Sequence, residues 1–250
     1  RGGAQMSGAK TSRLPGFYTI SHRERLDVLA ANADLDDESR RYLSTGGGLP
    51  LAVADKMSEN VVSTFGLPLS VALNFRINGA DRLIPMATEE PSVVAAASNA
   101  ARMVRTSGGF SGEADPPIMT AQVQLDDVAD VDRARVAIED ARGRILAIGD
   151  QSIPRMLERG GGCRDLEVRV LDRAEGVVVV LVYVDVGDAM GANLVDTVAE
   201  AVAPVVQDLA GGRMGLRILS NLPLRRLVRV HAQVSSEALG GLAVADGVAR

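Results

Sequence analysis

The order in which the hydrophobic period changes along residues 118–219 constrains the fold more than any other feature of the chain. Four segments have the apolar pattern of strands, and two longer segments have apolar residues at helical spacing. The expected strands span 118–125, 166–171, 177–186 and 216–219, and the expected helices span 131–148 and 192–209. The resulting order, β-α-β-β-α-β, is the split-βαβ or ferredoxin-like arrangement. We therefore expect one compact domain with an antiparallel sheet.

The residues before this domain follow a different pattern. Ser21 begins a capping-box sequence, which predicts the start of a helix, and 49–62 has helical spacing. Two alternating runs flank Asn78-Gly79, which predicts a tight β-hairpin. A helix of small residues is expected at 93–104, with Pro91 at its first position.

These patterns predict an α+β protein of two domains. A mixed helical and β large domain comprises residues 1–116, and a smaller ferredoxin-like domain at 117–221 is inserted into it. Residues 222–250 are expected to rejoin the large domain, because an inserted domain returns the chain close to its entry point.

The composition excludes several classes of protein. The chain has 27 Lys and Arg against 32 Asp and Glu, a net charge of −5, whereas a general nucleic-acid binder needs a basic surface. A single cysteine excludes a disulfide scaffold, and His22 and His231 have no Cys or Glu at ligand spacing, so no metal site is expected. The longest apolar run, Val177–Val184, is far shorter than the ~20 residues of a membrane span. We expect a cytoplasmic protein without a nucleic-acid or membrane partner.

The segment Glu89-Glu90-Pro91-Ser92 lies between the hairpin and the following helix. Carboxylates at a helix start can simply cap it, because the positive end of the helix dipole stabilises them. The alternative is catalytic, with Glu90 as an acid or base at the mouth of a cleft and Ser92 as a hydroxyl that contacts substrate. Position in the sequence alone favours the plain cap and leaves the catalytic interpretation open.

Two further segments are candidates for ligand binding. Asp185–Asn193 leads from an apolar strand into a helix, and its small residues could bring backbone N–H groups close to a phosphate. It lacks the G-x-G-x-x-G spacing, so a plain turn with an Asp cap is the alternative. Gly160–Asp165 contains three successive glycines, which form either a flexible elbow or a close backbone approach to a ligand. Cys163 is expected only to pack.

Six stretches of the sequence resemble the 3-hydroxy-3-methylglutaryl-coenzyme A (HMG-CoA) reductase family in its bacterial class II form. They occur in the order of the family and extend to about residue 222. They are Ser12-Arg-Leu-Pro15, Glu59-Asn-Val-Val62, Pro85-Met-Ala-Thr-Glu-Glu-Pro-Ser92, Gly160-Gly-Gly-Cys-Arg-Asp165, Asp188-Ala-Met-Gly-Ala-Asn193 and Leu219-Ser-Asn-Leu222. Glu-Glu-Pro-Ser is the form of this motif in class II members, whereas class I members have Thr-Glu-Gly-Cys.

The resemblance implies that the large domain carries HMG-CoA and that the small domain holds a nicotinamide cofactor by a non-Rossmann route. It implies that Glu90 is the catalytic glutamate and that Ser92 contacts the hydroxymethylglutaryl group. The cofactor-binding residues that it implies are Asp150, Asp188, Met190, Gly191, Asn193 and Asn221. Asn221 is expected near the nicotinamide. Asp150 is the candidate for the acidic residue that meets the adenosine ribose in some members and repels a 2′-phosphate, so NAD is expected, with NADP as the alternative.

The implied reaction is the reversible, four-electron interconversion of HMG-CoA with mevalonate and CoA. It uses two NAD(P)H and proceeds by two hydride transfers through mevaldyl-CoA and mevaldehyde. The family also uses a lysine, an aspartate and a histidine, yet neither Lys10 nor Lys56 lies in its lysine motif. We therefore expect an N-terminal fragment that lacks the C-terminal catalytic part and has no useful activity alone. The complete protein is expected to be a homodimer, or a larger assembly of dimers, with its active site at the subunit interface.

Two other interpretations remain open. The chain could be a non-enzymatic module that binds a small molecule through a ferredoxin-like sensor domain, since a fold does not fix a function. It could also be a decayed or truncated paralogue of an enzyme. The combination of the Glu90 segment with the Asp188–Asn193 turn favours the enzyme, because a sensor has no need of both.

Overall fold

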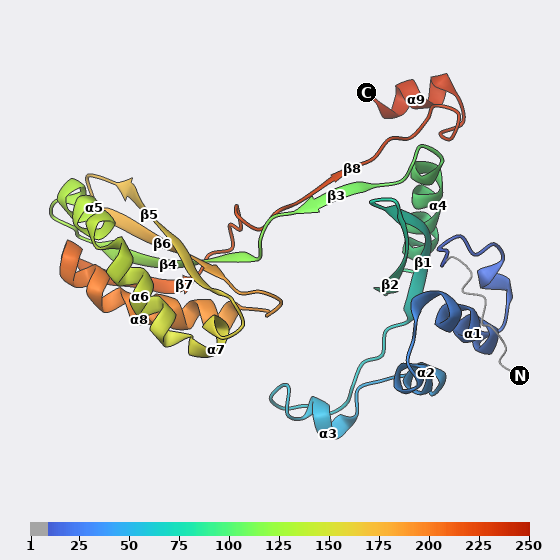
Figure 1. The fold of residues 1–250 in the computed structure, drawn as a ribbon, viewed down its shortest axis with the longest axis horizontal. Coiled ribbons are helices and arrows are strands. Elements are labelled where there is room, and N and C mark those ends of the chain that lie inside the picture. Colours follow the sequence, from blue (N-terminus) through green and yellow to red (C-terminus); the bar gives the residue numbers. More distant parts are fainter. Residues whose placement is uncertain (1–9) are drawn as a thin grey trace, which may run out of the picture. The chain divides into compact units, whose positions relative to one another are not determined.

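The computed structural model describes residues 10–250, which form two compact units. Unit 1 comprises the described residues up to Gly112 together with Val230–Arg250, and unit 2 comprises Glu113–Arg229. The chain enters and leaves unit 2 through two paired strands, β3 (Ser111–Ala114) and β8 (Val228–His231) (Figure 1). Unit 2 is therefore formed by one uninterrupted stretch of the chain, and unit 1 by two.

Unit 2 is a four-stranded antiparallel sheet with helices on one face (Figure 1). The strands lie in the order β5-β6-β4-β7, and every neighbouring pair is antiparallel. In chain order the elements are β4 (Ile118–Asp126), α5 (Val131–Asp140), α6 (Arg142–Ser152), α7 (Pro154–Leu157), β5 (Gly162–Asp172), β6 (Val177–Asp185), α8 (Ala192–Ala210) and β7 (Arg213–Leu219). The elements thus follow the order β-α-β-β-α-β, with three helices in the first crossover between strands.

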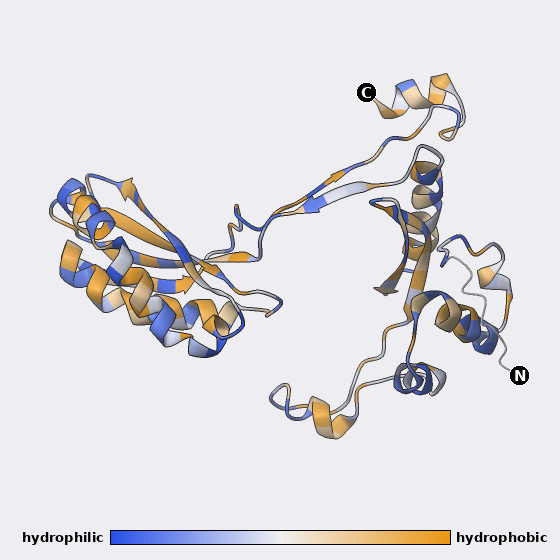
Figure 2. Ribbon diagram, viewed as in Figure 1, coloured by the Kyte–Doolittle hydropathy of each residue, from blue (hydrophilic) through white to orange (hydrophobic). Residues whose placement is uncertain are grey.

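The core of unit 2 lies between this sheet and its helices. β6 is apolar from Val177 to Val184, as suits a central strand that is buried on both faces. Its even-numbered residues, from Val178 to Val184, have no exposed surface and pack with α5, α6 and α8. On the opposite face Val179, Leu181 and Tyr183 form a smaller cluster with Ile118. The hydropathy colouring shows β6 as a hydrophobic strand and α8 with one hydrophobic side (Figure 2).

Several boundaries in unit 2 differ from those that the sequence predicts, among them the start of β7, at Arg213 rather than 216, and the end of α6, at Ser152 rather than 148. The helix expected at 131–148 breaks at Ala141, whose ψ of 4° is not helical. A new helix begins at Arg142, whose guanidinium donates a hydrogen bond to the Leu166 carbonyl at 2.8 Å. β5 begins at Gly162, four residues earlier than expected, because Gly162 pairs with Asp185 across the sheet.

Unit 1 consists of a hairpin, one longer helix against it and several short helices. The elements are η1 (Phe17–Thr19), α1 (His22–Ala33), α2 (Asp37–Ser44), α3 (Leu51–Ala54), β1 (Leu69–Ile77), β2 (Ala80–Ala87), α4 (Val93–Thr106) and α9 (Leu242–Val248). The hairpin turn is confirmed, since Asn78 and Gly79 both have the positive φ that a tight turn requires. The capping box at Ser21 is also confirmed, because its hydroxyl accepts from the Glu24 N–H and the Glu24 carboxylate accepts from the Ser21 N–H.

One expected helix of unit 1 is wrong in its extent, and another is confirmed except for the place of Pro91. The segment 49–62 is helical only in α3, and Asn60, with a φ of 58°, has a backbone conformation that a helix cannot contain. The helix expected at 93–104 is confirmed as α4, which begins at Val93. Pro91 lies in the preceding turn, which is closed by a hydrogen bond from the Val93 N–H to the Glu90 carbonyl, and is not the first helical residue.

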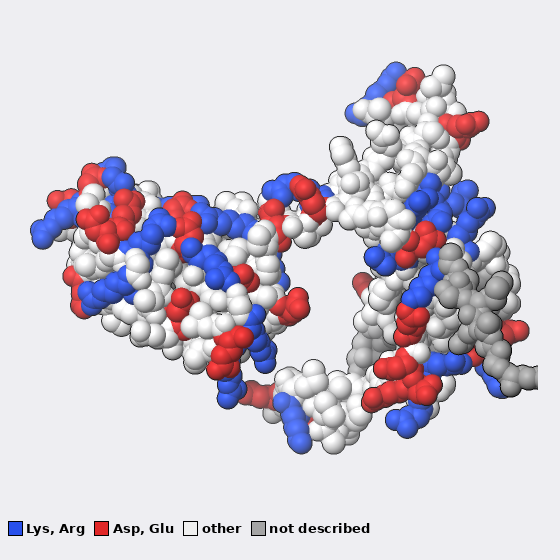
Figure 3. Space-filling view, viewed as in Figure 1, with Lys and Arg blue, Asp and Glu red and all other residues white. Residues whose placement is uncertain are grey.

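Unit 1 buries little apolar surface of its own. Its buried hydrophobic residues within the described part of the chain are Ala54, Ala72, Ala101 and Val104. Large side chains are exposed instead, with Val62 at 93% and Phe65 at 90%. Phe65 borders an apolar groove with a volume of about 1290 Å³. α3 is hydrophobic in Figure 2, and its surroundings are largely uncharged in Figure 3. An exposed apolar surface of this kind is typical of an interaction site.

An ion pair joins the hairpin of unit 1 to α4 and to the segment before α1. Arg105 on α4 donates to both carboxylate oxygens of Asp81, at 2.9 and 3.0 Å. The Ser12 N–H and the Thr11 hydroxyl also donate to Asp81, at 2.9 and 3.2 Å. The Arg105 hydrogen bonds, more than any other contact, lower the pKa of Asp81 to about 2.

In the full-length protein, Asp81→Asn is expected to lower the free energy of unfolding at neutral pH by about 1–2 kcal/mol. Because the pKa of Asp81 is about 2 in the folded state against 3.8 ordinarily, this stabilisation is complete above about pH 4 and is lost as the pH falls towards 2. Urea unfolding between about pH 6 and about pH 2.5 measures it. Asp27→Asn is the control, since its ion pair with Arg40 is exposed and should contribute little. An Asp81→Asn effect that is independent of pH would contradict the prediction.

Candidate functional site

In unit 1, Glu90 and Ser92 lie in the turn between β2 and α4, and both are exposed. The Ser92 hydroxyl donates to Glu90 Oε1 at 3.0 Å. Ser92 is the N-cap residue of α4 by position, yet among the described residues its side chain caps no backbone N–H. The serine hydroxyl therefore orients the Glu90 carboxylate and does not cap the helix. This contact weakens the interpretation of the segment as a plain helix cap.

The apolar groove of unit 1 lies beside this turn. Its lining includes Ala87 at the end of β2 and Val94 at the start of α4, the two elements that flank Glu90. An exposed carboxylate, oriented by a neighbouring hydroxyl and set next to an apolar groove, can exchange a proton with a polar group of a ligand that lies in the groove.

In unit 2, strand register brings several segments to one end of the sheet. Ile118, the first residue of β4, pairs with Asp185, the last residue of β6, and Asp185 also pairs with Gly162. β7 ends beside the same part of β4, where Leu219 pairs with Ala121. The turn after β6, the glycine segment at the start of β5 and the residues after β7 therefore lie at the same end.

The turn from β6 to α8, together with the first turn of α8, carries four of the predicted cofactor residues. Asp188, Met190 and Asn193 are exposed, the Met190 side chain by 74%. Gly191 is buried with a φ of 87°, and a Cβ there would lie 2.5 Å from Met119 Sδ, so the position requires glycine. Within the described residues no side chain caps the 19-residue helix that starts here. Its first N–H groups are thus available to an anion.

Asp150 lies at the C-terminal part of α6 and is half-buried. Its Oδ1 accepts from the Cys163 N–H at 2.7 Å, so one carboxylate oxygen is already engaged by the start of β5. Cys163 itself belongs to the core, as expected. Burial, and to a lesser degree the neighbouring Asp150 carboxylate, raises the pKa of the Cys163 thiol to about 12, so the thiol remains protonated.

Asn221, the last predicted cofactor residue, follows β7 and is exposed. The Ser220 N–H donates to the Thr120 carbonyl at 2.8 Å, and the Leu219 N–H donates to the Asp196 carboxylate on α8 at 2.8 Å. These contacts fix the two residues before Asn221. All six predicted cofactor residues therefore belong to unit 2, whereas Glu90 and Ser92 belong to unit 1.

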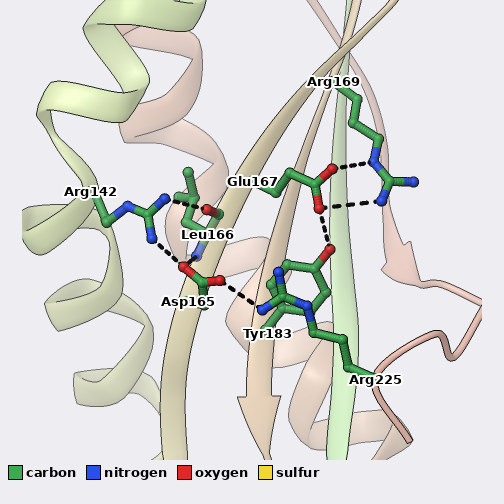
Figure 4. Close-up of polar contacts among 7 residues, drawn as sticks. All are labelled: Arg142, Asp165, Leu166, Glu167, Arg169, Tyr183 and Arg225. Carbon is green, nitrogen blue, oxygen red and sulfur yellow. Dashed lines mark hydrogen bonds and ion pairs between the residues drawn. The ribbon is translucent and has the colours of Figure 1, made fainter. Parts of the chain in front are cut away.

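The structure also shows a polar network on the sheet face opposite the helices (Figure 4). Asp165 on β5 accepts from Arg142 and from Arg225, the latter at 2.6 Å. The Arg225 guanidinium lies 3.5 Å from the centre of the Tyr183 ring, a cation–π contact. The hydrogen bond from Arg225 is the main reason that the pKa of Asp165 is lowered.

The same network continues along β5. The Tyr183 hydroxyl donates to Glu167 at 2.5 Å, and Arg169 donates to both Glu167 oxygens, at 2.7 and 3.2 Å. Hydrogen bonds, first from Arg169 and then from Tyr183, lower the pKa of Glu167. The sequence analysis missed this network. The alternation of charged residues along β5 signals a polar face, but nothing in the sequence indicates that Arg225 lies against it.

Other classes of site are not seen in residues 10–250. No group of three or more His, Cys, Asp and Glu side chains is arranged to hold a metal ion in this part of the chain. None of its helices combines the length and the apolar character needed to cross a membrane. Basic and acidic side chains are interspersed over unit 2 in the face that Figure 3 shows.

Comparison with known proteins identifies the family. Residues 21–248 match the family described as hydroxymethylglutaryl-coenzyme A reductase, and the chain belongs to this family. The curated 3-hydroxy-3-methylglutaryl-coenzyme A reductase of Archaeoglobus fulgidus is 46% identical over 241 residues, which are 96% of this chain and 55% of the relative. A probable enzyme of the same name from Borreliella burgdorferi is 32% identical over 165 residues, 66% of this chain and 37% of the relative.

The fold is similar to solved structures of the family. The class II reductase from Streptococcus pneumoniae, bound to NADPH in open conformations, superposes with a TM-score of 0.86 at 38% identity and covers 90% of this chain and 61% of that one. The resemblance to class II members and the mixed α+β fold are thus confirmed. The chain spans about half the length of the curated relatives that it matches.

Proposed function

We propose that the complete protein containing this chain is an HMG-CoA reductase. It interconverts HMG-CoA with mevalonate and CoA, and in the reductive direction it consumes two NAD(P)H and two protons. The observation that supports this most strongly is the match of residues 21–248 to the family, within which Glu90 is held by the Ser92 hydroxyl.

Unit 1 is part of the large domain that carries HMG-CoA, and unit 2 is the inserted ferredoxin-like domain that holds the cofactor. The strand order β5-β6-β4-β7 and the position of unit 2 within the chain support this assignment. The cofactor-binding residues are Asp188, Met190, Gly191, Asn193 and Asn221, with Asp150 at the ribose. Their place at one end of the sheet, beside the free N–H groups of α8, suits a ligand that carries phosphates.

The residues of this chain hold the reactants and move protons. Bound NAD(P)H would supply the hydride, so the protein must provide position and charge. Glu90 exchanges a proton with the substrate oxygen as that oxygen changes between carbonyl and hydroxyl, and Ser92 holds the Glu90 carboxylate and contacts the hydroxymethylglutaryl group. The lysine, aspartate and histidine of the family lie in the remaining part of the complete protein.

The complete protein is a homodimer with the active site at the subunit interface. The exposed apolar groove of unit 1 supports this proposal, because such a surface requires a covering partner. Sedimentation of the full-length protein tests it, with twice the monomer mass expected and a monomeric, active enzyme as the contradicting result.

The reaction is tested by following absorbance at 340 nm with the full-length protein, mevalonate, CoA and either NAD⁺ or NADP⁺. We expect reduction of the cofactor that requires both mevalonate and CoA. NAD⁺ should be preferred, because the Asp150 carboxylate would repel a 2′-phosphate. Asp150→Asn should then raise the ratio of NADP⁺ to NAD⁺ efficiency by about tenfold, since a charge repulsion of about 1.4 kcal/mol is removed.

Two outcomes would overturn parts of this proposal. An unchanged cofactor ratio in Asp150→Asn would remove Asp150 from the site. A folded protein that binds a nicotinamide cofactor but shows no turnover in either direction would favour the non-enzymatic binding module instead.

A further inference from the structure

The segment Gly160–Asp165 has no role in the proposed reaction, yet it bonds to three segments of unit 2 that carry predicted cofactor residues. Three consecutive residues of this segment, Cys163, Arg164 and Asp165, each bond to a different segment that carries predicted cofactor residues. The three partner segments are far apart in the sequence, so this convergence depends on the fold of the sheet.

The first contact holds Asp150. The Cys163 N–H donates to Asp150 Oδ1 at 2.7 Å. Gly162, with a φ of 124°, allows this approach, because a Cβ there would lie only 2.9 Å from the same oxygen. The direction of the Asp150 carboxylate is therefore set by the backbone at the start of β5.

The second contact holds the turn after β6. Arg164 Nη2 donates to Asp185 Oδ2 at 3.1 Å, and the other oxygen of Asp185 accepts from the Gly187 N–H at 3.1 Å. Asp185 thus links Arg164 to the backbone of the residue before Asp188. Gly161 packs just as closely, since a Cβ there would lie 2.5 Å from the Asp185 carbonyl oxygen.

The third contact holds the segment after Asn221. Arg225 donates to Asp165 at 2.6 Å and stacks on Tyr183, while Arg142 holds the same carboxylate from α6 (Figure 4). On the other side of Asn221, the preceding residue is bonded to β4. Asn221 therefore lies in a short segment that is fixed on both sides, and Arg225 is the fixing point after it.

We propose that Cys163, Arg164 and Asp165 are positioning residues that together set the geometry of the cofactor site, with Arg225 as the partner through which Asp165 acts on Asn221. This inference rests on the proposed function. A binding site works only when its contact residues are held within about 0.5 Å of the productive geometry, and supporting hydrogen bonds supply that precision. Gly161 and Gly162, just before these residues, allow the backbone to come close enough to Asp185 and Asp150 for the first two contacts.

The exposure of these ion pairs separates their effect on binding from their effect on stability. Arg164 and Arg225 are 45% and 42% exposed, and ion pairs with such exposure contribute little to the stability of a protein. Removal of one pair should therefore leave the fold intact while it releases one segment of the cofactor site.

The test measures the Kd of NADH and NADPH for the full-length protein by the fluorescence of the reduced nicotinamide. The variants are Arg164→Gln, Asp165→Asn and Arg225→Gln. Each is expected to weaken binding of the preferred cofactor by about tenfold, and to raise its KM while the KM for HMG-CoA stays constant. Arg225→Lys, which keeps the charge, should recover part of the loss. Arg173→Gln is the matched control, because it removes an arginine that is paired bidentately with Asp132 in the same unit, and it should bind as the wild type does.

The outcomes distinguish this inference from the proposed function. If the wild type binds neither NADH nor NADPH, the proposed function fails and this inference fails with it. A second outcome is that the wild type binds the cofactor while Arg164→Gln and Arg225→Gln bind it as tightly as the wild type or the Arg173→Gln control does. In that case only the positioning role is overturned. Thermal melting of each variant checks its fold. Should Asp165→Asn melt early, Arg225→Gln still tests the same contact, because Arg225 lies outside the helices and strands.

Discussion

Glu90→Gln in the full-length protein is expected to lower the rate of NAD(P)H-coupled turnover of HMG-CoA by about 10³-fold, with folding and cofactor binding unchanged. The amide has the shape of the carboxylate and can still accept the Ser92 hydrogen bond, so the substitution removes only the capacity to exchange a proton. Absorbance at 340 nm measures the rate, and nicotinamide fluorescence measures cofactor binding in the same preparation.

The adjacent carboxylate provides the control. Glu89 is exposed as Glu90 is, but the Ser92 hydroxyl bonds to Glu90. Glu89→Gln should therefore retain most of the activity. Equal losses in the two variants would point to a general effect of charge, and full activity in Glu90→Gln would remove this residue from the mechanism.

A polypeptide of residues 113–229 is expected to fold alone, with a single cooperative unfolding transition. The main hydrophobic core of the described chain is formed by residues of unit 2, from Ala121 to Val206, and none of its residues belongs to unit 1. Circular dichroism during urea unfolding, together with the dispersion of amide resonances, measures this. A broad, non-cooperative transition would show that unit 2 needs the remainder of the protein.

Two substitutions on α5 test whether this core provides most of the stability of unit 2. Ile138 has no exposed surface, so Ile138→Ala should lower the free energy of unfolding by about 2–5 kcal/mol. Val136, on the same helix, is 49% exposed, and Val136→Ala should change it by less than about 0.5 kcal/mol. Similar effects of the two substitutions would contradict the burial that the structure assigns to this helix.

Unit 1 presents the opposite case. Its buried apolar residues within the described chain are three alanines and one valine, and its groove is bordered by exposed side chains such as Phe65. The free energy of burial scales with the apolar area removed from water, so this unit gains little from its own contacts. We therefore expect unit 1, taken alone, to be much less stable than unit 2.

The sequence by itself determined the elements whose signals are local. The apolar run that predicts a strand at 177–186 is observed as β6, Val177–Asp185, and the helical spacing at 192–209 is observed as α8, Ala192–Ala210. The turn at Asn78-Gly79 and the capping box at Ser21 are also observed, because each depends on residues within one turn of the chain. The six family stretches are runs of neighbouring residues, so they likewise indicate the family without any knowledge of tertiary contacts.

Only the tertiary structure decided which of these segments support one another. The pairing of Asp165 with Arg225 joins residues 60 positions apart, and that of Arg164 with Asp185 joins residues 21 apart. The early start of β5 at Gly162 follows from the register of β6, and the break at Ala141 accompanies the reach of Arg142 to β5. Local patterns fix the backbone of each element through nearest neighbours, whereas these contacts arise from strand register and helix packing, which depend on the whole sheet.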